Sequence, residues 1–166
     1  MSNDPHFKLE IRPISAADDA AIKHIIQQVG REFGAIGEGF GPSDPEVEQM
    51  SKHYDPSQGS QYWVAVLNDI VIGGGGIAPF NASDSVCELK KLFLLPESRG
   101  VGAGKALTQT CLEFAKQAGY QHCYLDTLAS MQSAIALYRH FGFEQLSEPM
   151  PGTEHNGCDV WMLKTL

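Results

Sequence analysis

The sequence predicts an α/β domain built on a mixed sheet. Apolar segments with strand-like spacing alternate along the chain with segments of helical spacing, in the order β-α-(α)-β-β-β-α-β-α-β-β. A glycine-rich run separates one of these strands from the most regular helix. The length of 166 residues suits one sizeable core, so we expect a single domain over residues 1–166.

The first third of the chain predicts a strand, a helix and a long irregular segment. Residues 9–14 form the strand, and Ser15 followed by Asp18 is typical of the capping box that begins a helix. Apolar residues then share one helical face: Ile22, Ile25, Ile26 and Val29. Residues 30–60 are rich in Gly, Pro, Ser and Asp, which predicts loops with a short helix near residues 46–53.

Two strands, residues 62–67 and 70–77, are expected to pair as a hairpin that turns at Asn68 and Asp69. The second strand contains four consecutive glycines, residues 73–76. Glycine inside a strand indicates a bulge or a close approach of another segment, or simply weak and mobile structure. The sequence does not distinguish between these alternatives.

The second half of the chain predicts four strands and two helices. The strands are residues 87–95, 122–127, 143–146 and 160–163, and the helices are residues 103–118 and 132–140. The first of these helices has an unbroken face of small and apolar residues: Ala103, Ala106, Leu107, Thr110, Cys111, Phe114, Ala115 and Ala118. Gly119 is a natural end for it.

The glycine-rich run predicts a binding site for phosphate. Gly100, Gly102 and Gly104 leave little side-chain bulk at a strand-to-helix turn, so backbone N–H groups can approach a ligand closely. The start of the helix directs unpaired N–H groups at the same place. A Walker A loop is excluded, because Arg99 stands at its first glycine and Ala106 at its hydroxyl position. The spacing also differs from the G-x-G-x-x-G dinucleotide fingerprint.

Arg99, Gly102 and Gly104 match the pattern R/Q-x-x-G-x-G/A, so the run resembles the coenzyme A signature of the GNAT superfamily of acyl-CoA-dependent N-acetyltransferases. Residues 134–143, with Ala-Ile-Ala-Leu-Tyr followed by Phe-Gly-Phe, resemble the second landmark of that family. The resemblance covers residues 87–146 in order and spacing.

This resemblance implies a mostly antiparallel sheet that is flanked by helices and splayed at its centre, where strands 87–95 and 122–127 separate to admit the pantetheine arm. It implies acetyl-CoA as the co-substrate and a primary amine of a small molecule or peptide as the acceptor. It also implies direct transfer in a ternary complex, since the sequence contains no G-x-S-x-G elbow and no recognisable Cys/His pair. The alternatives are a non-catalytic acyl-CoA-binding or sensor module, and O-acetyl or other acyl transfer on the same fold.

The resemblance assigns two kinds of contact to the coenzyme. Backbone groups of Leu92, Phe93 and Leu94 would pair with pantetheine as an added strand does. The second group binds the pyrophosphate through backbone N–H groups: Arg99, Gly100, Val101, Gly102, Ala103, Gly104 and Lys105. The side chains of Arg99 and Lys105 are further candidates for phosphate contacts, although a solvated lysine is equally ordinary.

Tyr138 and Glu88 are the candidates for catalysis. Tyr138 resembles the family tyrosine whose hydroxyl lies near the coenzyme A sulfur, and the alternative is a core tyrosine. Glu88 lies eleven residues before Arg99, where several relatives place a catalytic base. Strand alternation is expected to put Glu88 on one face with Lys90, Leu92 and Leu94. The alternatives for the base are a surface ion pair of Glu88 with a lysine, and base work by water or by the 30–60 loops.

One position departs from the family pattern. Many members have an asparagine that contacts coenzyme A seven residues before the tyrosine, and Met131 stands there in this chain. That polar contact is therefore either absent or supplied by Ser130 or Ser133.

The composition limits the classes of ligand and partner that we expect. The net charge of −8 argues against nucleic acid, yet residues 87–140 carry six basic and four acidic side chains, which fits a polyanionic small ligand as well as ordinary solvated faces. Acidic residues in the 30–60 segment would suit a cationic acceptor or form a solvated face: Glu32, Glu38, Asp44, Glu46 and Glu48. We expect buried thiols at the four cysteines, no metal, no membrane contact, a cytoplasmic location and a possible homodimer.

Overall fold

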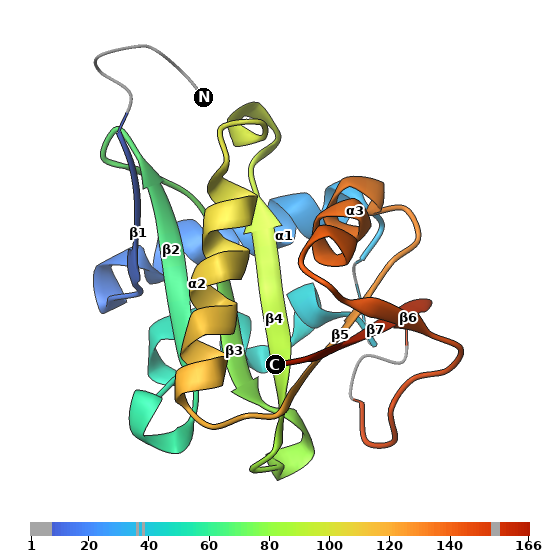
Figure 1. The fold of residues 1–166 in the computed structure, drawn as a ribbon. Coiled ribbons are helices and arrows are strands. Elements are labelled where there is room, and N and C mark those ends of the chain that lie inside the picture. Colours follow the sequence, from blue (N-terminus) through green and yellow to red (C-terminus); the bar gives the residue numbers. More distant parts are fainter. Residues whose placement is uncertain (1–7, 36, 38, 154–156) are drawn as a thin grey trace.

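The computed structural model describes residues 8–35, 37, 39–153 and 157–166, which form one α/β domain around a seven-stranded mixed sheet (Figure 1). The strands are β1 (Leu9–Pro13), β2 (Gln61–Leu67), β3 (Ile70–Pro79), β4 (Val86–Leu94), β5 (His122–Thr127), β6 (Glu144–Leu146) and β7 (Val160–Thr165). The helices are α1 (Asp19–Glu32), α2 (Ala103–Gln117) and α3 (Gln132–His140). Short 3₁₀ segments are η1 (Ala16–Asp18), η2 (Gly41–Ser43), η3 (Pro45–Lys52), η4 (Pro56–Gln58), η5 (Phe80–Ala82) and η6 (Pro96–Ser98). The fold class predicted from the sequence is confirmed.

The sheet is splayed at its centre. Its strand order is β1-β2-β3-β4-β5-β7-β6, and every neighbouring pair is antiparallel except β4 and β5. These two parallel strands pair only at their beginnings, where Val86, Cys87 and Glu88 lie opposite His122, Cys123 and Tyr124. Beyond Glu88, β4 pairs with β3 alone and β5 with β7 alone. The two central strands therefore diverge and leave a gap on one side of the molecule.

Helices α1 and α2 lie on opposite faces of the sheet (Figure 1). An apolar core fills the space on each side. The α2-side core is built around Leu107 and Cys111 of α2 and Leu125 of β5. The α1-side core is built around Ile22 of α1 and Tyr62 of β2. Each helix buries one stripe of apolar side chains, as the helical spacing predicts. Within the part of the chain that is described, no helix is both long and apolar enough to cross a bilayer.

A bulge in β4 reverses the direction in which its side chains point. Lys91 has a φ of +52°, and the register shifts so that two β4 residues, Lys91 and Leu92, oppose Gly75 alone. Leu92 and Leu94 consequently pack on the α2-side core. Glu88 pairs with Ala78, which packs on the α1-side core, and the two partners share a face. The prediction that Glu88, Lys90, Leu92 and Leu94 share one face is therefore wrong.

The glycines of β3 lie opposite this bulge. A Cβ atom on Gly73 would come within 2.5 Å of the Phe93 carbonyl oxygen, and one on Gly75 within 2.6 Å of Leu92 Cδ1. On Gly74 it would lie 2.6 Å from the Tyr62 ring. Of the alternatives left open for residues 73–76, the structure shows a close approach of another segment, and the bulge lies in β4 opposite Gly75.

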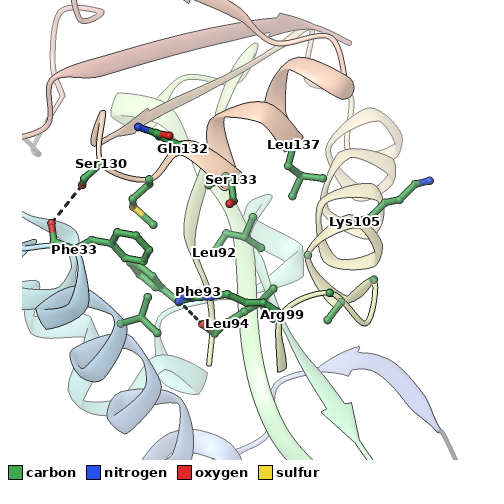
Figure 2. Close-up of a pocket in the computed structure, with 17 residues that line it drawn as sticks. Phe33, Leu92, Phe93, Leu94, Arg99, Lys105, Ser130, Gln132, Ser133 and Leu137 are labelled. Atoms are coloured by element: carbon green, nitrogen blue, oxygen red, sulfur yellow. Dashed lines mark hydrogen bonds between the residues drawn. The ribbon is translucent and has the colours of Figure 1, made fainter. Parts of the chain in front are cut away.

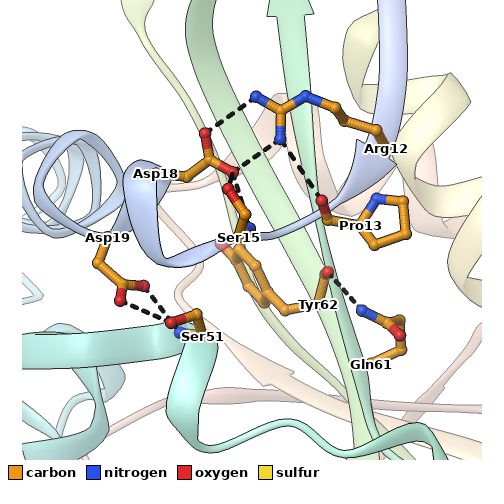
Figure 3. A network of polar contacts seen from close by, with 8 residues as sticks. All are labelled: Arg12, Pro13, Ser15, Asp18, Asp19, Ser51, Gln61 and Tyr62. Carbon is orange, nitrogen blue, oxygen red and sulfur yellow. Dashed lines mark hydrogen bonds and ion pairs between the residues drawn. The ribbon is translucent and has the colours of Figure 1, made fainter.

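Polar contacts hold the start of α1 in place and attach the η3 segment to it (Figure 3). The Arg12 guanidinium donates to both oxygens of Asp18, at 2.7 and 2.9 Å, and Asp18 also accepts from the Ser15 N–H at 2.8 Å. Asp19 accepts from the backbone N–H and the hydroxyl of Ser51, at 2.8 and 2.6 Å. The helix start predicted after Ser15 is confirmed, and η3 is held against α1.

Candidate active site

A cavity of about 640 Å³ occupies the gap where β4 and β5 diverge (Figure 2). Its lining comes from α1, β4, the glycine turn, the start of α2 and the start of α3. The sequence-predicted coenzyme residues that line it are Leu92, Phe93, Leu94, Arg99, Gly100, Gly102, Ala103, Gly104 and Lys105. Val101 is the exception, since its side chain packs partly buried against the α2-side core.

The glycine turn presents a row of unused donors. Gly100 and Gly102 have φ values of +89° and +86°, and a Cβ on either would meet no atom within 4 Å. Gly102 is the N-cap of α2 and supplies no side chain to the helix start. Within the described residues, the backbone N–H groups from Gly100 to Lys105 make no hydrogen bond to protein atoms. Consecutive free N–H groups at a helix N-terminus form a site for a phosphate-like anion.

The Arg99 side chain is turned toward α1. Its guanidinium binds both oxygens of Glu32, at 2.6 and 3.0 Å, and donates to the Leu94 carbonyl at 3.0 Å. It also lies 5.3 Å from the centre of the Phe33 ring, a cation–π distance. The hydrogen bond from Arg99 lowers the pKa of Glu32 below its ordinary value. Lys105 is exposed, and Figure 2 shows its side chain extending away from Leu92 and Arg99.

The wall of the cavity suits an extended apolar chain. Among the described residues, the β5-facing edge of β4 has no strand partner beyond Glu88, so a ligand can add there as a strand. The Leu94 carbonyl already accepts a hydrogen bond from Arg99. Leu92 and Leu94 form the floor, and Leu137 of α3 faces them across the gap (Figure 2). A long flexible arm with amide groups fits this combination of apolar walls and free backbone.

A second, smaller cavity of about 70 Å³ adjoins the first and shares Leu92, Phe93 and Met131 with it. It brings together Glu88 and Tyr138, which are 50 residues apart in the chain. The rest of its lining is Ala35, Phe40, Gly41, Pro42, Leu89, Lys90, Lys91, Leu125, Asp126, Thr127, Leu128 and Cys158.

Tyr138 is 5% exposed, and its ring lies edge-on to Phe143 at 5.8 Å between centres. The fully buried hydroxyls that lack a partner among the described residues are those of Tyr54 and Tyr124, not that of Tyr138. Burial raises the pKa of Tyr138 above its ordinary value, and the nearby Cys111 and Cys123 add to this effect. The phenol therefore stays protonated and able to donate at neutral pH. Glu88 is half-buried at the last β4 position that pairs with β5.

The lysines near Glu88 bind other carboxylates. Lys91, whose side chain is 2% exposed, places its ammonium 2.6 Å from Glu46 and 2.9 Å from Asp44, and Lys90 lies 3.0 Å from Glu46. Burial alone would raise the pKa of Glu46, but Lys91 and Lys90 hold it down to about 2. The expectation of a solvated acidic face is therefore wrong for Asp44 and Glu46.

Two other acidic residues of the same segment also form ion pairs, but the Glu48 side chain is 66% exposed, so the expectation of a solvated face holds at Glu48. Glu48 binds Lys23 at 2.6 Å, and Glu32 binds Arg99. Glu38 lies outside the described residues. The acidic side chains that suggested a cationic acceptor are thus largely used in ion pairs within the protein.

At the position of the family asparagine, Met131 lines both cavities. Ser130 and Ser133 both line the larger cavity, and the Ser130 hydroxyl donates to the Phe33 carbonyl at 3.4 Å (Figure 2). No group of three or more His, Cys, Asp or Glu in the described residues is arranged to hold a metal ion.

Sequence alone gives no role to Asp126, which lies on β5 and lines the smaller cavity. Strand alternation could have placed it on the same face as Tyr124. Nothing in the sequence indicates that this face lies beside Glu88, because that contact depends on the pairing of β4 with β5.

Comparisons with known proteins agree with this geometry. Residues 27–143 match the model of a family described as the acetyltransferase (GNAT) family. A relative from Escherichia coli (strain K12), called uncharacterized N-acetyltransferase YjgM, is 39% identical over 158 residues, which cover 94% of each chain. A GNAT-family acetyltransferase structure from Staphylococcus aureus Mu50 has a TM-score of 0.82 at 20% identity and covers 95% of this chain and 99% of its own. The structure of yncA from Salmonella typhimurium with its cofactor acetyl-CoA has a TM-score of 0.76 at 20% identity. The match covers 95% of this chain and 94% of the yncA chain.

Proposed function

The chain belongs to the GNAT family of acetyltransferases, and we propose that it transfers an acetyl group from acetyl-CoA directly to a primary amine of a small molecule or peptide. The observation that carries this proposal is the adjacency of two cavities at the gap between β4 and β5. One is bounded by the glycine turn, and the other contains Glu88 and Tyr138.

In this proposal the larger cavity binds acetyl-CoA. Backbone N–H groups of the turn from Gly100 to Lys105, including that of Val101, bind the pyrophosphate, whereas the Arg99 N–H donates to the Pro96 carbonyl. The pantetheine arm lies along β4 and pairs with backbone groups of Leu92, Phe93 and Leu94. The thioester then lies near Met131, where the two cavities meet.

The smaller cavity binds the acceptor amine. Glu88 takes a proton from the ammonium, directly or through water, and the neutral nitrogen attacks the thioester carbonyl. A C–N bond forms and the C–S bond breaks, while the hydroxyl of Tyr138 gives its proton to the leaving thiolate and is reprotonated from solvent. The Tyr138 hydroxyl is protonated, since burial raises its pKa, so it is present as a hydrogen-bond donor to the leaving sulfur.

Direct transfer is supported by the state of the thiols. Cys87, Cys111 and Cys123 are fully buried, and burial raises the pKa values of Cys111 and Cys123. Cys158 lines the smaller cavity, but burial and nearby carboxylates raise its pKa to about 12. A thiol that stays protonated is a poor nucleophile, so a covalent acetyl-cysteine step is disfavoured.

The test combines acetyl-CoA binding, measured by thermal shift, with release of free coenzyme A thiol across a panel of amines. Gly102→Val should lose both, since a side chain there enters the proposed pyrophosphate site. Gly119→Val is the matched control, because Gly119 also has a positive φ (+93°) and open space, but lies at the opposite end of α2.

The control should lose stability and keep acetyl-CoA binding. Equal binding by the Gly102 variant and the parent would refute the proposed coenzyme site. Binding of acetyl-CoA without turnover of any amine would instead favour a non-catalytic binding module.

A further inference from the structure

Lys91 combines a strained backbone with a buried charge. Its φ of +52° lies in the left-handed region, which glycine adopts freely and which residues with a side chain rarely adopt. Its side chain is 2% exposed, so the ammonium group has lost nearly all of its hydration. Glycine at this position would avoid both costs. The bulge in β4 therefore does not by itself explain the lysine, and the contacts of its side chain become informative.

The ammonium group of Lys91 connects two walls of the smaller cavity. It lies 2.9 Å from Asp44 and 2.6 Å from Glu46, two carboxylates at the start of η3. The segment directly before η3 is η2, whose Gly41 and Pro42 line the smaller cavity. Lys91 itself lines this cavity from β4. The ion pairs of Lys91 thus join the β4 wall of the cavity to the wall that η2 forms.

The β4 end of this connection is fixed without the ammonium group. The Tyr62 hydroxyl donates to the Lys91 carbonyl at 2.8 Å, which holds the bulge from the α1 side of the sheet. β4 also pairs with β3 on both sides of the bulge. Loss of the ammonium group should therefore leave β4, and the coenzyme cavity that it bounds, largely in place.

The other end of the connection has separate contacts only farther along η3. Asp19 of α1 accepts hydrogen bonds from the backbone N–H and the hydroxyl of Ser51, at 2.8 and 2.6 Å (Figure 3). Lys23 of α1 binds Glu48 at 2.6 Å. These contacts attach the later part of η3 to α1. The start of η3, beside the cavity, is attached to β4 by the ion pairs of Lys91.

We propose that Lys91 is a positioning residue for the acceptor, because its ammonium group holds η2 against β4 and thereby fixes the wall that Gly41 and Pro42 form. This inference rests on the proposed function, in which the smaller cavity binds the amine. A buried ion pair often adds no net stability over apolar side chains of similar size, and its best-attested role is to select one arrangement of the segments that it joins. Lys91 acts here through the cavity wall and not on the reacting atoms.

The test is steady-state kinetics with acetyl-CoA and three primary amines: benzylamine, 2-phenylethylamine and glycinamide. Lys91→Met keeps an unbranched side chain and removes the ammonium group, so it should raise the KM for the amine by about tenfold or more. The KM for acetyl-CoA should stay within about twofold, because β4 keeps its pairing with β3. Lys23→Met is the matched control, since it breaks an exposed ion pair of η3 away from both cavities, and it should leave both KM values unchanged.

A second variant separates the connection from the balance of charge. Loss of one charge from a buried cluster can destabilise a whole fold. Lys91→Met combined with Asp44→Asn removes one charge of each sign and leaves Lys90 paired with Glu46 at 3.0 Å. This double variant should raise the amine KM as the single variant does.

Three results would overturn the inference and leave acetyl transfer intact. An unchanged amine KM in Lys91→Met would show that the cavity wall does not depend on the ammonium group. An equal rise of both KM values would indicate a general loss of structure. Return of the amine KM to the parent value in the double variant would assign the effect to unbalanced charge.

Failure of the proposed function itself has a different signature, in which acetyl-CoA binds and none of the three amines is acetylated. Hydrogen exchange, which does not depend on turnover, then decides the inference. The N–H groups of Ser43, Asp44 and Val47 are hydrogen-bonded in the parent. In the double variant, peptides from residues 40–48 should exchange about tenfold faster, while peptides from residues 86–94 keep their protection. Equal exchange of residues 40–48 in both proteins, or faster exchange in both segments, contradicts the inference.

Discussion

The guanidinium of Arg99 lies 2.6 Å from the carboxylate of Glu32, so the glycine turn is tied to the last turn of α1. These residues are 67 positions apart in the chain. The loop that follows α1 reaches the smaller cavity through Ala35, Phe40 and Pro42. The proposed coenzyme turn and the proposed acceptor cavity are therefore connected through one partly exposed ion pair.

Glu32→Gln should strengthen acetyl-CoA binding modestly. Phosphate groups near the turn would compete with Glu32 for Arg99, and a partly exposed pair contributes only about 0–1 kcal/mol, which corresponds to at most roughly a fivefold gain in affinity. Arg99→Gln should weaken binding instead. Calorimetric Kd values at low and high salt measure both changes. If Glu32→Gln weakens acetyl-CoA binding as much as Arg99→Gln does, the ion pair has a structural role, and Arg99 does not leave Glu32 to bind phosphate.

The local parts of this architecture were predictable from the sequence. The start of α2 follows from glycine spacing, and the end of α2 follows from Gly119, because helix signals act within a few residues. The β4 bulge was not predictable. Strand alternation assumes a regular register, and nothing in the residue type of Lys91 marks the positive φ that breaks it.

Contacts between distant segments were also not predictable from the sequence. Asp44 and Glu46 form ion pairs with Lys91, 47 and 45 residues away, so their role depends on how η3 packs against β4. Asp126 approaches the Glu88 side of the sheet only because β4 and β5 pair for three residues before they diverge. The coenzyme residues were easier to predict, since most of them lie in one continuous segment.

Tyr138→Phe should lower turnover while the fold remains intact. Loss of a proton donor should slow the reaction by about 10²–10⁴-fold. Tyr120→Phe is a matched control, because the Tyr120 hydroxyl donates to the Gly59 carbonyl at 2.9 Å, outside both cavities. The control should lose about 1 kcal/mol of stability and no activity. Turnover and melting temperature measured on the same samples separate the two effects, and full activity in Tyr138→Phe would make this residue a core tyrosine.

Glu88→Gln should lower turnover most strongly near neutral pH. If Glu88 is the base, kcat at saturating acetyl-CoA should fall sharply there and recover partly at high pH, where free amine is already abundant. Acetyl-CoA affinity should change little, since Glu88 lines the smaller cavity and not the larger one. Glu113→Gln, on the exposed side of α2, is the control. A pH–rate profile that keeps its height and shape in Glu88→Gln would move the base role to water or to the 30–60 segment.

Glu46→Gln should remove part of the acid sensitivity of the fold. Lys91 and Lys90 hold the pKa of Glu46 at about 2 against an ordinary value of 4.5, so the folded state favours the charged form. This contribution, on the order of 3 kcal/mol, is fully present above pH 4.5 and is lost as the pH falls toward 2. At neutral pH the variant should be less stable than the parent, because buried Lys91 loses one of the two carboxylates that it binds among the described residues and keeps Asp44. The difference in free energy of unfolding, measured with urea from pH 7 down to pH 3, should narrow as the parent loses stability. A difference that stays constant over this range would show that the ion pairs of Glu46 do not set its pKa.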